Sequence, residues 1–227
     1  MSWVTKTLNS TLGQKLLMAL TGFFLILFLV VHLAGNLQLL IPDNGESFNL
    51  YAHNMAINNF IRSVSIINFG LILLHVVYSV ILTKHNKKAR PVGYAETDAS
   101  TNSTWASRNM GILGTLILIF LLVHLRGFWY RLKFGSPDKV LLGDTEVDNA
   151  FIIVVEAFKN PIYVGFYVIS MVFLAFHLSH GFASAFQTLG INHKKYTPLI
   201  QKVGLGFAIL IPTLFAMIPI VMYIQSL

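Results

Sequence analysis

Five long apolar segments dominate this chain of 227 residues. A helix rises about 1.5 Å per residue, so roughly 20 apolar residues cross a hydrocarbon core of about 30 Å. Each segment is long enough to do so. We therefore predict an all-α integral membrane protein with five transmembrane helices in a single domain. The predicted spans are residues 14–40, 60–83, 108–130, 161–189 and 199–225.

The composition supports this class and excludes several others. Hydrophobic residues make up 55% of the chain and charged residues 11%, with a mean hydropathy of +0.68, values outside the range of ordinary soluble domains. The absence of cysteine excludes disulfides, iron–sulfur ligation by this chain and a cysteine nucleophile. The formal net charge of +7 comes from cations beside the apolar segments, so we interpret it as a topology signal rather than as a nucleic-acid-binding surface.

The distribution of these cations predicts the orientation of the chain. Five spans place the termini on opposite sides of the membrane, with ten Lys and Arg residues on the N-terminal side and six on the other. Residues 84–90 and 193–202 contribute most of the excess. The positive-inside rule then puts the N-terminus in the cytoplasm. The first apolar segment is longer than the core of a signal peptide, so we expect it to be retained.

Between the spans, the sequence predicts simple connections. Residues 93–104 are polar and rich in Ser, Thr and Asn, which is typical of a loop. The connection at residues 134–156 is expected to hold a short surface helix, because residues 151–155 are apolar. Pro212 and Pro219 lie inside the fifth segment, where they predict a kink.

Four of the five apolar segments each contain a histidine at a distinctive depth, and an ionisable side chain in a membrane span is by default a functional-site hypothesis. His32 and His124 lie roughly 24–25 Å from the cytoplasmic edge at helical rise, whereas His75 and His177 lie roughly 14–15 Å from it. The histidines thus form two layers about 10 Å apart. We call His75 and His177 the inner pair, and His32 and His124 the outer pair.

Two imidazoles facing each other in an apolar bundle are the axial ligands of a low-spin b-type haem. We predict one haem at each pair, with Leu, Ile and Phe as walls and with Gly35, Gly70 and Gly181 allowing close approach of the macrocycle. The alternative is that these histidines only bond neighbouring helices, as a single intramembrane histidine usually does. Pairing by depth makes that alternative weaker. Zinc is disfavoured because two histidines per layer do not complete a tetrahedral site.

Several other polar residues are secondary candidates. His180 follows His177 by three residues and points to a neighbouring face, so we expect it to hydrogen-bond a haem propionate, with a role as alternative ligand left open. A quinone site is expected near the outer pair, where polar side chains can bond a carbonyl or relay a proton, although loop residues of this kind are commonly just solvated. The candidates are Asn36, Gln38, Glu46, His53 and Arg126.

The segment FHLSHGFASAFQTLGIN, residues 176–192, together with the histidines of the other three spans, resembles the cytochrome b subunit of succinate:quinone oxidoreductases in its single-chain, five-helix, dihaem form. That family includes succinate dehydrogenases and fumarate reductases, and the resemblance covers nearly the whole chain. It implies that helices 1–4 form a haem-binding bundle and that helix 5 is peripheral. It also implies two haem b groups, a proximal one held by His75 and His177 and a distal one held by His32 and His124.

The resemblance further implies what the chain does. It would anchor succinate dehydrogenase to the bacterial cytoplasmic (inner) membrane and transfer electrons between an iron–sulfur subunit and a membrane quinone, with menaquinone expected. FAD and the iron–sulfur clusters belong only to the partner flavoprotein and iron–sulfur subunits, which dock on the cytoplasmic face, so this chain does no chemistry on succinate. Residues 84–90 and 193–202 are either docking surface or topology signal alone. The reverse direction, as a fumarate reductase subunit, stays open.

Two further points concern this interpretation: a missing glutamate in the fourth span, and the alternative that the chain is a transporter. Ala175 stands where some dihaem fumarate reductases have a glutamate thought to pass protons, so a proton path of that kind is not expected here. A histidine-containing proton-coupled transporter would need charges inside its spans and broken helices at the midplane. The spans lack such charges. A purely structural anchor with degenerate sites is disfavoured because all four histidines are present.

Overall fold

The computed structural model describes residues 3–89 and 103–227. Arg90 and residues 93–102 of the expected loop lie outside this range. The elements in chain order are α1 (Trp3–Asn9), α2 (Thr11–Asn36), η1 (Leu37–Leu40), α3 (Glu46–Ile57), α4 (Asn59–Lys88), α6 (Trp105–Arg108), α7 (Met110–His124), η2 (Leu125–Trp129), α8 (Tyr130–Phe134), β1 (Lys139–Leu142), β2 (Thr145–Asp148), α9 (Ala150–Phe158), α10 (Pro161–Thr188) and α11 (Thr197–Gln225).

Within residues 3–89 and 103–227, five helical segments are long and apolar enough to cross a membrane, which confirms the predicted fold class. They are Thr11–Leu40, Asn59–Lys88, Met110–Phe134, Pro161–Thr188 and Thr197–Gln225, each beginning and ending within five residues of its predicted range. Large apolar side chains on all five segments are at least half exposed, as lipid-facing positions require. Examples are Leu27, Leu73, Ile119, Ile169 and Ile209.

By their contacts, the residues described here divide into two compact units. The first is drawn from residues 1–28, 67–115 and 175–209, and it contains His75 and His177. The second is drawn from residues 29–66, 116–174 and 210–227, and it contains His32 and His124. Each histidine pair predicted from depth therefore falls within one unit.

The connections of the second unit contain the short helix that was predicted and a hairpin that was not. Helix α9 covers the apolar stretch at residues 151–155. Strands β1 and β2 pair antiparallel, with Lys139 opposite Asp148 and a turn at Gly143, whose φ is 60°. The Gly143–Asp144 dipeptide between two short stretches that each contain a Val is a hairpin signal that the sequence prediction missed.

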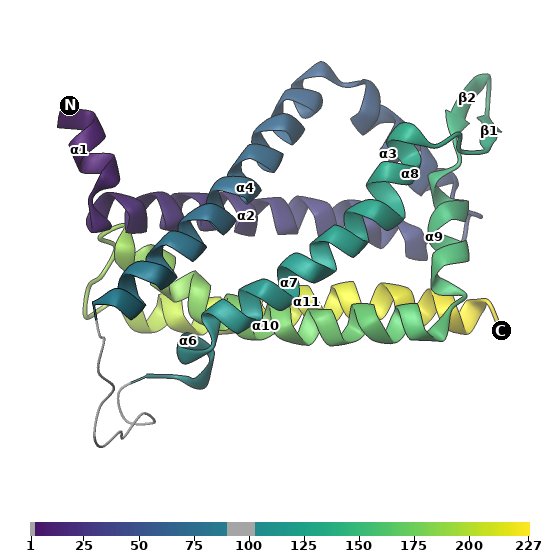
Figure 1. Cartoon of the computed structure of the whole chain (residues 1–227). Helices are drawn as coiled ribbons and strands as arrows, with labels where there is room; N and C mark the ends of the chain where they lie inside the picture. Colours follow the sequence, from purple (N-terminus) through teal and green to yellow (C-terminus); the bar gives the residue numbers. More distant parts are fainter. Residues whose placement is uncertain (1–2, 90–102) are drawn as a thin grey trace. The chain divides into compact units, whose positions relative to one another are not determined.

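A buried amide joins α3 to α9, and Figure 1 shows α3 beside α9 and the hairpin. Asn49 is only 2% exposed; its side chain donates to Oδ1 of Asn149 at 3.1 Å and accepts from the backbone N–H of Phe151 at 2.8 Å. Asn149 in turn caps α9, since its Oδ1 accepts from the N–H of Ile152 at 3.2 Å. One side chain thus fixes the start of α9 to α3.

The turn before α3 is held by a carboxylate. Asp43 accepts hydrogen bonds from the backbone N–H groups of Gly45 and Ser47 at 3.0 and 2.9 Å, and Asn44 and Gly45 adopt positive φ angles of 56° and 84°. The hydrogen bonds from Ser47 lower the pKa of Asp43. A fixed turn here sets where α3 begins.

We expect Asn49→Ala to loosen this connection. The substitution leaves the N–H of Phe151 without its acceptor, at a cost of about 1–3 kcal/mol for a buried unsatisfied group. It also removes one of the two donors to Oδ1 of Asn149, which keeps the N–H of Ile152. Amide hydrogen exchange should rise in α9. Asn54→Ala on the exposed side of α3 is the matched control and should leave exchange unchanged. Equal exchange in the two variants would contradict the assigned role.

Candidate functional site

The inner pair lies within the first unit, on two antiparallel spans. His75 is on α4 and His177 on α10, and their ring centroids are 6.4 Å apart with an interplanar angle of 67°. Both side chains are partly buried. The structure therefore brings together the two histidines that share a predicted depth.

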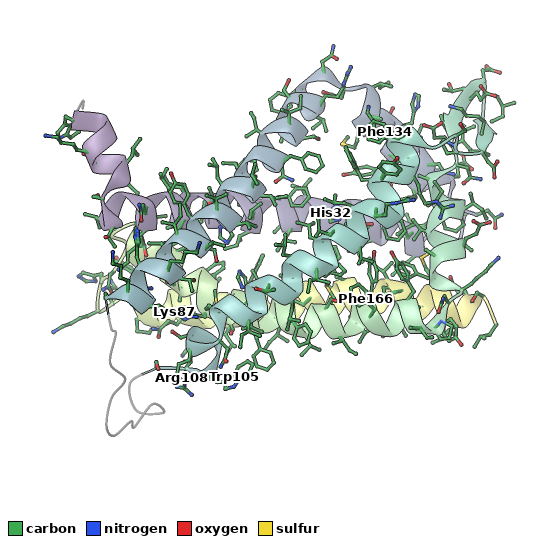
Figure 2. All side chains as sticks on the ribbon, in the orientation of Figure 1. His32, Lys87, Trp105, Arg108, Phe134 and Phe166 are labelled. Atoms are coloured by element: carbon green, nitrogen blue, oxygen red, sulfur yellow. The ribbon has the colours of Figure 1, made fainter. Side chains whose placement is uncertain are left out.

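The outer pair lies within the second unit. His32 is on α2, where Figure 2 labels it, and His124 is the last residue of α7. Their ring centroids are 5.8 Å apart and their planes are nearly perpendicular, at 86°. Each unit thus contains one close pair of imidazoles. No group of three or more His, Asp or Glu residues capable of holding a metal ion occurs in the described residues, so each cluster offers two imidazoles.

These separations fit a metal bound between the rings. An iron about 2.0 Å from each nitrogen, with each nitrogen roughly 1.1 Å from its ring centroid, would separate the centroids by about 6.2 Å. The observed values of 6.4 and 5.8 Å bracket that distance. Edge-to-face ring contacts occupy a similar distance range, so the hydrogen bonds of the rings are the more discriminating feature.

Thr21 determines the proton position on His75. Its Oγ1 lies 3.1 Å from Nδ1 of His75 and 2.9 Å from the carbonyl oxygen of Leu17 on its own helix. The hydroxyl has one hydrogen, and it donates that hydrogen to the helix carbonyl, as Thr commonly does. Toward His75 it can therefore only accept. This arrangement places the ring hydrogen on Nδ1 and leaves Nε2 with a free lone pair.

His124 meets a pair of phenols on α10. Its Nδ1 lies 3.3 Å from the hydroxyl of Tyr167, which is 3.1 Å from the hydroxyl of Tyr163. Tyr167 is 6% exposed, so its hydroxyl depends on these two partners. When His124 donates from Nδ1, Tyr167 accepts and passes its own hydrogen to Tyr163. Nε2 of His124 then has a free lone pair, as Nε2 of His75 does.

His32 and His177, the other members of the two pairs, have different surroundings. Asn36 donates to the backbone carbonyl of His32 at 2.7 Å, and its amide nitrogen is also 3.4 Å from Nδ1 of the His32 ring. Nδ1 of His177 is buried and, within the chain that the structure describes, has no hydrogen-bond partner. A buried polar atom of this kind is costly. The His177 ring thus has capacity for a group that is not part of the protein.

Two glycines outside the predicted set stand against the inner pair. A Cβ at Gly22 would lie 3.4 Å from the His75 ring, and one at Gly114 would lie 4.0 Å from the His177 ring. Gly35 instead accommodates Tyr51, whose ring would be 2.5 Å from an added Cβ. The other two predicted glycines are Gly70 and Gly181. A Cβ added at either one would have no neighbour within 4 Å among the described residues.

Aromatic side chains line the outer pair. The ring centroids of Phe120 and Phe128 are 5.7 and 5.4 Å from that of His124, and the centroid of Phe215 is 5.8 Å from that of His32. Phe166, labelled in Figure 2, packs on Phe120, with 6.1 Å between the two ring centroids. Helix α11 therefore contributes Phe215 to the wall although it contains none of the histidines. Within the first unit, α11 also places Phe207 5.6 Å from Phe182.

Of the five residues predicted for a quinone, Arg126 lines both of the clefts described here. Asn36 is engaged by its own helix at His32. Gln38 is half-buried in η1, Glu46 is the exposed first residue of α3, and His53 is half-buried on α3. His180 is half-buried on α10. None of these lines either of the two clefts described here.

The cleft at Arg126, which we call the Arg126 cleft, lies wholly within the second unit. It has a volume of about 620 Å³, and a neighbouring hollow of about 520 Å³ shares Arg126, Arg131 and Glu156 with it. Arg131 and Glu156 approach each other to 3.8 Å. The lining residues are Leu122, Val123, Arg126, Gly127, Arg131, Glu156, Ala157, Asn160 and Tyr163.

Tyr163 connects this cleft to the outer pair. Its hydroxyl bonds Tyr167, which bonds His124, so a continuous hydrogen-bonded path joins the cleft lining to an imidazole. Gly127 makes room for Tyr163, because an added Cβ there would come within 2.5 Å of the phenol oxygen. The path gives the cleft a polar connection to the histidine.

The sequence reasoning missed the residues that support the histidines, although a signal for them exists. Gly22 and Gly114 each precede a histidine of their own helix by ten residues, and Thr21 precedes His32 by eleven. Ten residues rise about 15 Å, which exceeds the distance of about 10 Å between the two layers, so depth alone does not mark these positions. The shared offset of ten residues before a histidine does single out the two glycines, and Thr21 is the neighbour of Gly22.

Comparison with known proteins adds no assignment: no protein-family model, no curated protein and no solved structure matches this chain. The functional interpretation therefore depends on the geometry of the two histidine pairs and on the resemblance in the sequence.

Proposed function

We propose that this chain is the dihaem cytochrome b subunit that anchors a succinate:quinone oxidoreductase in the membrane. The observation that supports it most is the presence of two separate imidazole pairs with ring centroids 6.4 and 5.8 Å apart, each of which would offer two imidazole nitrogens to a haem iron. In this proposal, His75 and His177 hold the proximal haem, and His32 and His124 hold the distal one. Each haem, when bound, supplies a centre that accepts and releases one electron.

The side chains around the pairs perform distinct tasks in this proposal. Thr21 and Tyr167 hold Nδ1 of one histidine in each pair, which leaves Nε2 for iron. Gly22 and Gly114 keep side-chain bulk away from the inner pair, and the phenylalanines at the outer pair exclude water. A low dielectric around a redox centre is one of the protein's means of setting its potential.

The Arg126 cleft is the proposed quinone site, with menaquinone as the expected quinone. Its volume of about 620 Å³ is in the range of small-molecule sites. The lining combines apolar residues with the guanidinium of Arg126 and the hydroxyl of Tyr163, both of which can donate to a quinone carbonyl. The carboxylate of Glu156 can exchange protons with that oxygen, and Arg126 stacks over Tyr130 at 4.7 Å, which fixes its position.

The proposal also specifies the membrane in which the chain lies and the subunits that it binds. The chain would lie in the bacterial inner membrane with its N-terminus in the cytoplasm, where the flavoprotein and iron–sulfur subunits dock. Exposed cations at Lys87, Lys88, Lys194 and Lys195 are the proposed docking surface. In the succinate dehydrogenase direction electrons leave toward the quinone, and in the fumarate reductase direction they arrive from it; the same residues serve both directions.

Haem content tests the proposal directly. The chain purified from membranes of a haem-sufficient host should contain two haem b groups per chain, measured as pyridine haemochrome, with an α-band in the reduced-minus-oxidised spectrum. His85→Ala, an exposed histidine at the cytoplasmic end of α4, should retain both haems. A folded chain without haem would refute the proposal. Histidine-dependent proton uptake by such a haem-free chain in liposomes would favour a transporter instead.

A further inference from the structure

We propose that Thr21 and Tyr167 are positioning residues that set the electron-donating strength of His75 and His124, and that they set the reduction potentials of the two haem centres independently. This inference rests on the proposed function, because it requires haem at both pairs. It assigns roles to two hydroxyls that the sequence prediction did not include. Each hydroxyl contacts one histidine of one pair, and each contact lies within a single unit.

At the inner pair the hydrogen-bond direction is fixed by the helix. Thr21 is 4% exposed, and its only hydrogen is directed at the carbonyl oxygens of Leu17 and Met18, at 2.9 and 3.0 Å. Its oxygen therefore accepts from Nδ1 of His75, an imidazole that also hydrogen-bonds the backbone of Met18. An acceptor at Nδ1 increases the electron density that an imidazole gives to a metal and fixes the ring orientation. Thr21 thus stabilises the ferric form of the proximal centre.

At the outer pair the acceptor belongs to a chain of phenols. The Tyr167 oxygen accepts from Nδ1 of His124 only while its own hydrogen goes to Tyr163. Tyr163 is then free to donate into the Arg126 cleft, whose lining includes its side chain. The distal centre is therefore coupled to the cleft, whereas the contact at Thr21 ends at a helix carbonyl. The two centres therefore differ in the next hydrogen-bond partner of the hydroxyl: a backbone carbonyl for Thr21 and the phenol of Tyr163 for Tyr167.

Loss of either hydroxyl should make its histidine a weaker donor and favour ferrous iron. Groups that hydrogen-bond the free nitrogen of a metal-bound histidine typically contribute about 10–100-fold in affinity or activity. We therefore expect about a tenfold change in the reduction equilibrium of the affected haem, equivalent to a rise of roughly 59 mV for a one-electron couple. The haem at the other pair should keep its potential, because it contacts the other hydroxyl.

The experiment compares Thr21→Val and Tyr167→Phe in the full chain, by spectroelectrochemical titration and by the low-temperature EPR signals of the two ferric haems. Thr21→Val should raise only the proximal potential and Tyr167→Phe only the distal potential. Each variant is thus the control for the other. Thr21→Ser retains the hydroxyl and should restore the parental proximal potential.

The outcomes separate the two proposals. Parental protein without haem would overturn the proposed function and this inference together. Two haems in every protein but unchanged potentials and EPR signals in both variants would overturn the positioning role alone. The same holds if either variant shifts both centres equally, or if Thr21→Ser behaves like Thr21→Val. Tyr163→Phe should produce a smaller shift confined to the distal haem, and a shift of the proximal haem would contradict the phenol chain.

Discussion

Replacing His177 with alanine is expected to lower the haem content of the proposed dihaem subunit from two groups per chain to one, with the proximal haem lost and the distal haem retained. The reason is that His177 and His75 form one pair, whereas His32 and His124 form another within a different compact unit. A haem with a single remaining imidazole loses its low-spin bis-imidazole spectrum. Pyridine haemochrome analysis and low-temperature EPR of the purified chain would measure the change.

Two controls make this result interpretable. His124→Ala should have the converse effect and remove the distal haem, while His193→Ala, in the exposed segment before α11, should retain both. In His177→Gly, added imidazole should restore the proximal signal, which distinguishes a lost ligand from a failure to fold. Retention of the proximal haem in His177→Ala, or loss of only the distal one, would refute the pairing.

The second large effect is expected at the Arg126 cleft. Glu156→Gln should reduce quinone-linked turnover of the assembled complex by about 100-fold or more, the contribution that a positioned proton-transfer group typically makes. The amide keeps the shape of the side chain but cannot take up a proton. Both haems should still be reduced by dithionite, since Glu156 lies outside both histidine pairs. Turnover would be measured with a menaquinone analogue.

Glu146→Gln is the matched control for this substitution. Glu146 is exposed on β2 and belongs to neither cleft lining, so its loss should leave turnover at the parental level. If Glu156→Gln also turned over at the parental rate, the quinone would have to bind elsewhere. A defect in both variants would indicate damage to the hairpin and α9 rather than loss of a proton-transfer group.

The spans and the histidine pairing were predictable because both depend on local quantities. Span length follows from runs of apolar residues, and depth follows from the fixed rise of a helix. His32 and His124 could therefore be matched without knowing which way any helix faces. The five helical spans confirm the first prediction, and the ring separations support the second.

Side-chain partners were not predictable because they depend on helix rotation. A helix such as α7 is apolar on all sides, so nothing in its sequence marks the face that meets α10. Gly35 was expected beside a haem, yet Tyr51, 16 residues later, occupies that place. Asn36 was expected to meet a quinone, and the structure adds a partner that the sequence did not indicate, the backbone carbonyl of His32 on its own helix.

Directly after His124, the third span contains a π-helical turn, η2 (Leu125–Trp129), which contributes Arg126 and Gly127 to the lining of the cleft. A π turn accommodates one more residue than an α turn. Loss of a single residue there would restore an ordinary helix, while the residues beyond it, Arg131 among them, would keep the direction in which they face. The span can thus gain or lose one residue at this turn in evolution without moving His124, a proposed haem ligand, and without breaking the approach of Arg131 to Glu156.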